Sequence, residues 1–240
     1  MTLPPLVPSD PPGVEPVLWR GFEGDLAFDI GARKGENFAH FRALGFKEII
    51  ACEPEPGSYA ELQQRFGPSW GPTPHELTMA NPAVVTGWGT PHAVLMNVAV
   101  SDHVGTVQLA EVPMAISKGE WVTPGTDGME WSLSDWGEAK LHTVQCTTLD
   151  ALADDCGDPD LVVIDTEGHE AAILRGGQML MAACGTKWLI EFHAPGLKEE
   201  CEALLTASDH EVETVRHPHY PKDSAMWHQH GWLRAIPRRD

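Results

Sequence analysis

The stretch FDIGARKGENF, residues 28–38, decides how the chain folds. It closes an apolar run, residues 25–30, and leads through a turn with two glycines, Gly31 and Gly35, into a helix-like segment. Glycine-rich turns between a strand and a helix let the backbone approach a nucleotide-like ligand closely. The stretch therefore predicts the first strand, turn and helix of an α/β domain with such a ligand beside them.

Short apolar runs alternate with helical patterns through most of the chain, which is typical of a parallel sheet covered by helices. The helix after the first turn carries Phe38 and Phe41 on one face and ends at Gly45. The next helix has Ser58 and Glu61 at the spacing of a capping box. The remaining predicted elements are strands at 48–54, 92–102, 105–112 and 187–193, a strand–turn–helix block at 160–177, a helix at 197–208, and a closing antiparallel pair of strands at 210–217 and 231–237.

The composition excludes several classes of protein. A formal net charge of −19 argues against a nucleic-acid partner, because phosphates repel an acidic surface. No apolar run approaches the roughly 20 residues that a membrane-spanning helix needs, and the N-terminus lacks the pattern of a secretory signal. The cysteines are scattered and form no CxxC pair, which favours a reducing compartment over a disulfide framework. We therefore expect a cytoplasmic protein that binds neither nucleic acid nor membrane.

The chain length suits a single domain with elaborations. We expect a Pro-rich N-terminal arm over residues 1–23 and one domain over residues 24–240. Two irregular stretches, residues 67–91 and 113–142, contain several Gly, Pro and Trp residues and predict loop insertions. Long loops of this kind are either lids and substrate-binding elements or simply ordered insertions.

Two carboxylates indicate which ligand the glycine turn serves. Asp29 stands before the glycines, where it would repel the pyrophosphate of a dinucleotide, and the turn lacks the G-x-G-x-x-G spacing of dinucleotide sites. S-adenosylmethionine has no phosphate, and carboxylates suit its ammonium and sulfonium charges. Glu53 ends the second strand about 20 residues beyond Gly31, where an acid can accept hydrogen bonds from ribose hydroxyls. The pattern favours S-adenosylmethionine over a nicotinamide dinucleotide.

Five segments carry a resemblance to a known family: DIGARKGENFAHF, EIIACEPEPGSYAEL, NVAVSDHVGTVQL, TTLDAL and LVVIDTEGHEAAILRGG. In this order they resemble the FkbM family of S-adenosylmethionine-dependent methyltransferases, from about Asp25 to His193. The resemblance implies a Rossmann-like class I methyltransferase fold, a mostly parallel seven-stranded α/β sheet with helices on both faces and an antiparallel C-terminal strand. It also implies S-adenosyl-L-methionine as cofactor, S-adenosyl-L-homocysteine as product, and O-methylation of a sugar, polyketide or other small molecule. Thr166 departs from the family, which more often has an aliphatic residue there, and the arm and insertions lie outside the match.

The resemblance assigns residues to the cofactor site. The glycine turn and the ribose contact correspond to Asp29, Gly31, Gly35 and Glu53. The segment after the third strand, which contacts adenine in class I enzymes, corresponds to Asn97, Ser101 and Asp102. An ordinary turn would explain the last two residues equally well.

Methyl transfer to a hydroxyl requires an acceptor aligned with the methyl group, and a base that takes its proton is useful. Polar residues at the ends of the late strands are the candidates: Asp165, Glu167, His169, Glu191 and His193. His169 or Asp165 is the preferred base, and Glu191 or His193 is expected to orient the acceptor. The alternatives are structural, because Glu167 and Glu170 can complement a helix N-terminus and a backbone carbonyl can hold His193.

The same residues contain enough oxygen and nitrogen ligands for a divalent metal ion. No HExxH or similarly compact ligand spacing accompanies them, so the sequence assigns no metal. Histidines near the C-terminus form a second set that could bind a metal or merely lie on the surface: His217, His219, His228 and His230.

Two other functions stay open at this point. An NAD(P)-dependent oxidoreductase shares the broad architecture, and a non-catalytic accessory protein could keep the cofactor site without its chemistry. The sequence assigns neither the acceptor nor the oligomeric state.

Overall fold

The computed structural model describes residues 18–66, 92–111, 121–122, 140–183, 185–216 and 230–238. Most of the predicted arm and of both predicted insertions lies outside these ranges, as do His217, His219 and His228. None of the helices in these ranges combines the length and apolar character that crossing a bilayer requires.

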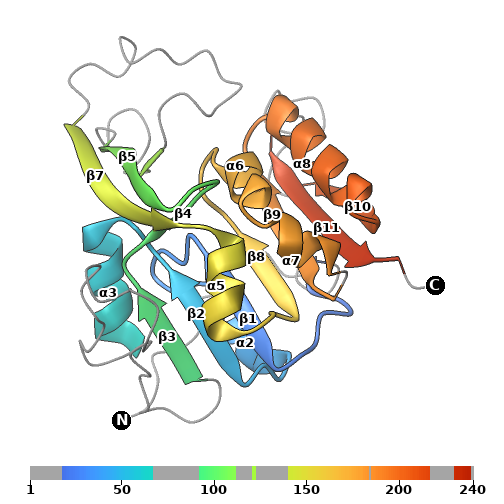
Figure 1. The fold of residues 1–240 in the computed structure, drawn as a ribbon. Helices are drawn as coiled ribbons and strands as arrows, with labels where there is room; N and C mark the ends of the chain where they lie inside the picture. Colours follow the sequence, from blue (N-terminus) through green and yellow to red (C-terminus); the bar gives the residue numbers. More distant parts are fainter. Residues whose placement is uncertain are drawn as a thin grey trace.

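A seven-stranded sheet forms the centre of the fold, in the order β10-β11-β9-β8-β1-β2-β3 (Figure 1). Its strands are β1 (Leu26–Ile30), β2 (Glu48–Cys52), β3 (His92–Met96), β8 (Leu161–Ile164), β9 (Lys187–Phe192), β10 (His210–Arg216) and β11 (Gly231–Pro237). Neighbouring strands pair in parallel from β3 to β9, whereas β11 is antiparallel to both β9 and β10. The predicted mostly parallel sheet and its antiparallel C-terminal strand are confirmed.

The strand order reverses beside β1. The chain runs from β1 outward to β2 and β3, then returns to β8 on the other side of β1. In register, Asp29 lies between Ala51 of β2 and Val163 of β8. Ligands of open α/β sheets bind outside the carboxyl ends of the strands at such a reversal, so the topology places a site after Ile30.

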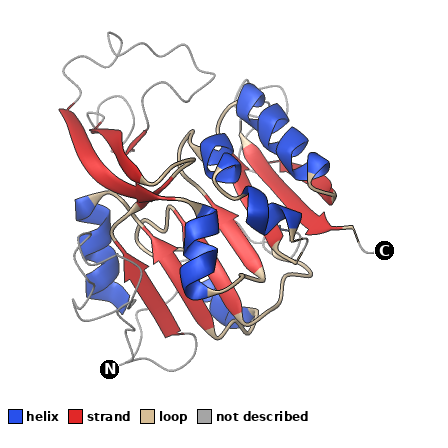
Figure 2. Cartoon of the chain, viewed as in Figure 1, coloured by secondary structure: helices blue, strands red, loops and turns tan. Residues whose placement is uncertain are grey.

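Helices cover both faces of the central sheet, as Figure 2 shows. Alternate strand residues point to opposite faces, and each face has its own buried apolar cluster. Phe28 and Ile30 pack in one cluster with side chains of α5, α6, α7 and α8, while Ala27 and Val163 pack in the other with Phe41. The helices are α2 (Phe38–Ala43), α3 (Pro56–Phe66), α5 (Leu149–Cys156), α6 (Glu170–Arg175), α7 (Gln178–Ala182) and α8 (Pro195–Ala207).

A second sheet of four strands, in the order β4-β7-β5-β6, stands beside the first (Figure 1). Its strands are β4 (Ala99–Val100), β5 (Gly105–Glu111), β6 (Trp121–Val122) and β7 (Lys140–Thr147). The predicted single strand at 92–102 is therefore wrong, because it divides between the two sheets. The division falls at Asn97, whose amide nitrogen bonds to the carbonyl oxygens of Glu53 and Pro54, and beyond it the chain pairs with β7.

The predicted capping box of Ser58 and Glu61 is also wrong. The helix α3 begins earlier, at Pro56. The carboxylate of Glu55 accepts hydrogen bonds from the backbone amides of Gly57, at 2.7 Å, and Ser58. Glu61 forms an ion pair with Lys34 at 2.8 Å. The acid that satisfies the free amides of the first turn thus precedes the helix, and the pair predicted from spacing makes other contacts.

Candidate functional site

A cleft of about 390 Å³ opens at the carboxyl ends of β1, β2 and β8. Its wall includes Gly31 after β1, Glu53 after β2, and Asp165 after β8, and β5 of the second sheet contributes Val107 and Leu109. Its volume lies within the roughly 300–1,000 Å³ typical of small-molecule and cofactor sites. The cleft therefore occupies the place that the strand order predicts.

The glycine turn packs tightly between the neighbouring strands. Gly31 has a φ of +84°, and its amide donates to the carbonyl of Cys52 at 2.9 Å. A Cβ atom on Gly31 would lie 1.9 Å from the carbonyl oxygen of Asp165. Both the left-handed backbone conformation and the close approach of β8 require glycine at this position.

Asp29 lies behind this turn, not among the described residues that line the cleft. Its side chain is 1% exposed, and Oδ1 accepts a hydrogen bond from the Asn37 amide at 3.0 Å. Oδ2 has no hydrogen-bond partner among the described residues. Burial raises the pKa of Asp29 to about 7 despite the opposing effect of Asn37. The carboxyl group is therefore poised to carry either a proton or a charge near neutral pH.

Glu53 connects the glycine turn to the loop after β2. Its Oε2 accepts from the amide of Arg33 at 2.8 Å, and its Oε1 accepts from the amide of Glu55 at 2.7 Å. Burial raises the pKa of Glu53 to about 7, while these two hydrogen bonds oppose the increase. A carboxylate has about four acceptor positions, so Glu53 keeps acceptor capacity on the cleft wall.

Asn97 supports Glu53 from behind. Its side-chain nitrogen donates to the carbonyl oxygens of Glu53 at 2.8 Å and Pro54 at 3.2 Å. These contacts use the amide hydrogens to shape the loop that carries Glu53. The position predicted to contact adenine thus has a structural task in this chain.

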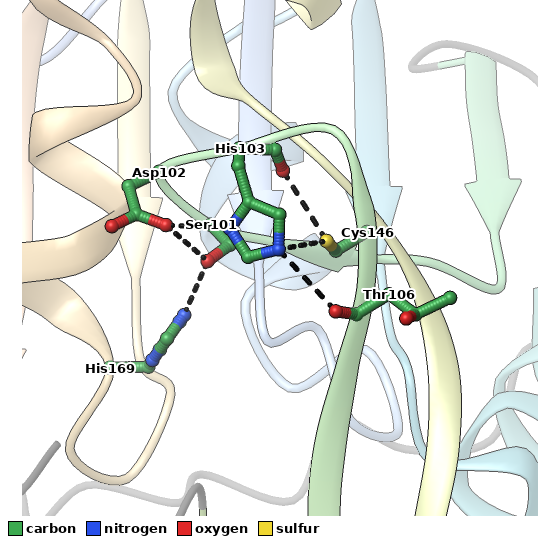
Figure 3. A network of polar contacts seen from close by, with 6 residues as sticks. All are labelled: Ser101, Asp102, His103, Thr106, Cys146 and His169. Carbon is green, nitrogen blue, oxygen red and sulfur yellow. Dashed lines mark hydrogen bonds and ion pairs between the residues drawn. The ribbon is translucent and has the colours of Figure 1, made fainter. Parts of the chain in front are cut away.

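A chain of polar contacts extends from the cleft to the surface (Figure 3). His169, on the cleft wall, has its Nε2 2.9 Å from Oγ of the buried Ser101. Ser101 Oγ lies 3.3 Å from Oδ1 of Asp102, which is 2.7 Å from Nδ1 of the exposed His103. Burial lowers the pKa of His169, whereas the hydrogen bond from His103 lowers the pKa of Asp102. The predicted residues Ser101, Asp102 and His169 therefore meet, with His169 alone on the cleft wall among them.

The late acidic residues gather around His193. Its Nδ1 is 3.0 Å from Oε1 of Glu170, and its Nε2 is 3.3 Å from Oε2 of Glu167 and 3.6 Å from Oδ1 of Asp165. Burial opposes protonation of His193, but Glu170, Glu167 and Asp165 raise its pKa well above the ordinary value. Burial and the charge of Asp165 raise the pKa of Glu191 as well. The charges of His193 and these four acidic residues therefore depend on one another.

Glu170 is the site residue that sequence reasoning missed. The sequence suggests only that Glu170 complements a helix N-terminus, but its side chain is 0% exposed and faces His193. Its Oε1 also accepts from the amide of Gly168 at 3.0 Å. Burial would raise the pKa of Glu170, but the hydrogen bond and charge of His193 outweigh burial and lower it. No local signal links Glu170 to His193, because the two residues come from different elements.

The fold and the cleft define a Rossmann-like α/β protein with its ligand site at the carboxyl edge of the sheet. The chain belongs to the FkbM methyltransferase family, since the model of the methyltransferase FkbM domain matches residues 29–220.

Solved structures resemble this chain at low sequence identity. Methyltransferase FkbM from Methylobacillus flagellatus KT is 15% identical with a TM-score of 0.53, and the match covers 89% of this chain and 44% of that one. The chain thus spans less than half the length of this relative. A precorrin-6y C5,15-methyltransferase from Geobacter metallireducens GS-15 is 11% identical with a TM-score of 0.49, covering 94% of this chain and 86% of the other. No curated protein matches the chain.

Proposed function

We propose that this protein binds S-adenosylmethionine in the cleft and transfers its methyl group to a hydroxyl oxygen of a small molecule, such as a sugar or a polyketide. The position of Glu53 carries the proposal. Its carboxylate stands on the cleft wall at the end of β2, directly beside the glycine turn, where the hydroxyls of a ribose can donate to it. Membership of the FkbM methyltransferase family supports the same cofactor.

The charges of the site favour a cationic cofactor over a dinucleotide. Carboxylates occupy the ends of all three central strands, with Glu53 and Asp165 on the wall and Asp29 behind it. They suit the sulfonium and ammonium groups of S-adenosylmethionine and would repel a pyrophosphate. Two cations, Arg33 and Lys34, also line the cleft, and Lys34 is paired with Glu61 at 2.8 Å.

The protein's part in the reaction is to align the two reactants and to take a proton. Methyl transfer is an in-line displacement in which the C–S bond breaks as the O–C bond forms, and alignment can lower its barrier by up to ~7–11 kcal/mol. We assign the base to His169, which lines the cleft; its Nδ1 is buried and has no hydrogen-bond partner among the described residues. Ser101, at 2.9 Å from Nε2, positions the imidazole.

Glu53→Gln is expected to weaken binding of S-adenosylmethionine roughly 100-fold, because hydrogen bonds to a charged group contribute about 1.5–3 kcal/mol each. Isothermal titration calorimetry measures the change. Glu48→Gln is the matched control, since Glu48 is exposed at the other end of the same strand; it should bind like the wild type. Absence of wild-type binding at millimolar cofactor contradicts the proposed function, whereas equal binding by Glu53→Gln contradicts the ribose assignment alone.

His169→Asn is expected to lower kcat about 10²–10⁴-fold, the usual contribution of a positioned base, with little change in cofactor affinity. Single-turnover methyl transfer from labelled S-adenosylmethionine to a hydroxylated acceptor measures it. Ser101→Ala keeps the imidazole and should cause a smaller loss. Full turnover by His169→Asn would move the base to Asp165, the other candidate on the wall.

A further inference from the structure

We propose that Asp165, Glu167 and His193 bind one divalent metal ion, of the six-coordinate class to which Mn²⁺ and Mg²⁺ belong. The methyl transfer proposed above requires no metal, so this site is an addition to it. We also infer that the ion holds the oxygen of the acceptor, and this role rests on the proposed function. The binding of the ion to the three residues does not rest on the proposed function.

The spacing of the three ligand atoms fits one ion. One ligand atom from each of Asp165, Glu167 and His193 lies within 4.8 Å of the other two. The imidazole nitrogen is 3.3 Å from the Glu167 oxygen and 3.6 Å from the Asp165 oxygen. Octahedral ligands ~2.1 Å from an ion are ~3.0 Å apart when adjacent and ~4.2 Å apart when opposite. The observed separations also exceed the ~2.7–2.9 Å of a charge-assisted hydrogen bond.

Glu170 prepares His193 to act as a ligand. Its Oε1 lies 3.0 Å from Nδ1 of His193, so a proton on Nδ1 leaves the lone pair of Nε2 for the ion. The carboxylate is 0% exposed and is fixed by the amide of Gly168 at 3.0 Å. Its Oε2 has no hydrogen-bond partner among the described residues. A histidine that binds a metal ion through one ring nitrogen usually donates a hydrogen bond from the other, often to a carboxylate. A histidine in a simple ion pair on the surface does not require such a buried partner.

The acidic residues around His193 favour the binding of a cation. Carboxylate oxygens of Asp165, Glu167 and Glu170 lie within 3.6 Å of one imidazole. His193 can offer these three carboxyl groups at most one positive charge, and buried charge is costly unless it is compensated. A divalent ion would compensate it. The sulfonium of the cofactor is the rival source of positive charge, so the test must separate the two.

The ligand set indicates the kind of ion. Two carboxylates and one imidazole combine the oxygen ligands preferred by Mg²⁺ and Mn²⁺ with a nitrogen that Mn²⁺ also accepts. Three protein ligands to a six-coordinate ion leave three positions for water or acceptor oxygens. Asp165 and Glu167 line the cleft, so an ion there is within reach of a bound small molecule.

Binding of Mn²⁺ to the full chain, freed of metals with EDTA, tests the site. The electron paramagnetic resonance signal of free Mn²⁺ is followed as protein is added, with and without S-adenosylhomocysteine. We expect one ion per chain. Asp165→Asn and Glu167→Gln, whose side chains are 42% and 33% exposed, should each weaken binding at least 10-fold. Glu170→Gln should weaken it about 10–100-fold, as loss of a second contact usually does.

Glu199→Gln, an exposed acid on α8, is the matched control and should bind Mn²⁺ like the wild type. Absence of Mn²⁺ binding by the wild type at millimolar ion, in both conditions, overturns the proposal even if the cofactor binds. Undiminished binding in Asp165→Asn and Glu167→Gln also overturns it, because the ion then lies elsewhere on the acidic surface. If Mn²⁺ binds through these residues but S-adenosylmethionine does not bind, the metal site stands and the proposed function fails.

Discussion

Gly31→Ala is expected to lower the free energy of unfolding by at least about 3 kcal/mol, as strain and overlap combine. The new Cβ atom would lie 1.9 Å from the carbonyl oxygen of Asp165, so β1 and β8 must separate at their carboxyl ends. The φ of +84° adds the strain of a left-handed conformation at a non-glycine residue. Urea unfolding measures the loss, and cofactor affinity should fall with it because the turn forms the cleft wall.

Gly45→Ala is a close control for this substitution. Gly45 has a φ of +87°, but a Cβ atom there would meet no other atom within 4 Å. It therefore reports the conformational strain alone, about 1–2 kcal/mol. The difference between the two variants isolates the close packing of the turn against β8. Equal losses in both would show that the turn yields easily and that the tight junction described here is wrong.

The glycine turn and Glu53 could be predicted because their signals are local. Gly31, Gly35 and Glu53 come from one strand–turn–helix–strand unit, and the physics of such a unit fixes where its polar ends lie. The mostly parallel sheet followed from the same alternation and from the resemblance, and it is confirmed. Local chemistry and the connection rules of parallel sheets were sufficient to place this turn and its carboxylate.

The contacts around His193 could not be predicted in the same way. His193 follows β9, whereas Glu170 begins α6, and only the pairing of β8 with β9 brings them together. The sequence placed the acids near the correct strand ends, but it could not tell a cap of a helix from a partner of a histidine. That distinction depends on burial, since a cap can remain solvated whereas Glu170 cannot.

The second sheet could not be predicted because residues 92–102 look like one continuous strand, whereas they contribute β3 to one sheet and β4 to the other. Residues 93–100 are apolar except for Asn97, and nothing in that pattern marks the exit of the chain from the central sheet. The exit depends on Asn97, whose amide contacts the loop after β2. Such a contact between distant segments is visible only in the folded chain. Asn97 consequently looks like a cofactor contact in the sequence and like a structural clamp in the fold.

Asp29→Asn is expected to stabilise the protein at pH 8 by up to about 4 kcal/mol, and at pH 5 by a smaller amount of about 2 kcal/mol. The pKa of Asp29 is raised from 3.8 to about 7 by burial, and each pKa unit corresponds to about 1.4 kcal/mol. Between these values the folded chain holds a proton that the unfolded chain has lost, so stability falls as pH rises toward 7. Asparagine carries no charge and keeps an oxygen for the hydrogen bond from Asn37 at 3.0 Å.

Urea unfolding of both proteins from pH 5 to pH 8.5, without cofactor, measures this effect. Asp25→Asn removes a similar charge from an exposed position just before β1, paired with Lys47 at 2.7 Å, and should give no comparable gain. The comparison separates burial of one carboxyl from the general repulsion of a chain with a net charge of −19, which both substitutions relieve equally. A parallel loss of stability with pH in wild type and Asp29→Asn would mean that Asp29 ionises as it does in water. Its unpartnered oxygen would then have to reach solvent or a cation, and the buried position behind the glycine turn would be wrong.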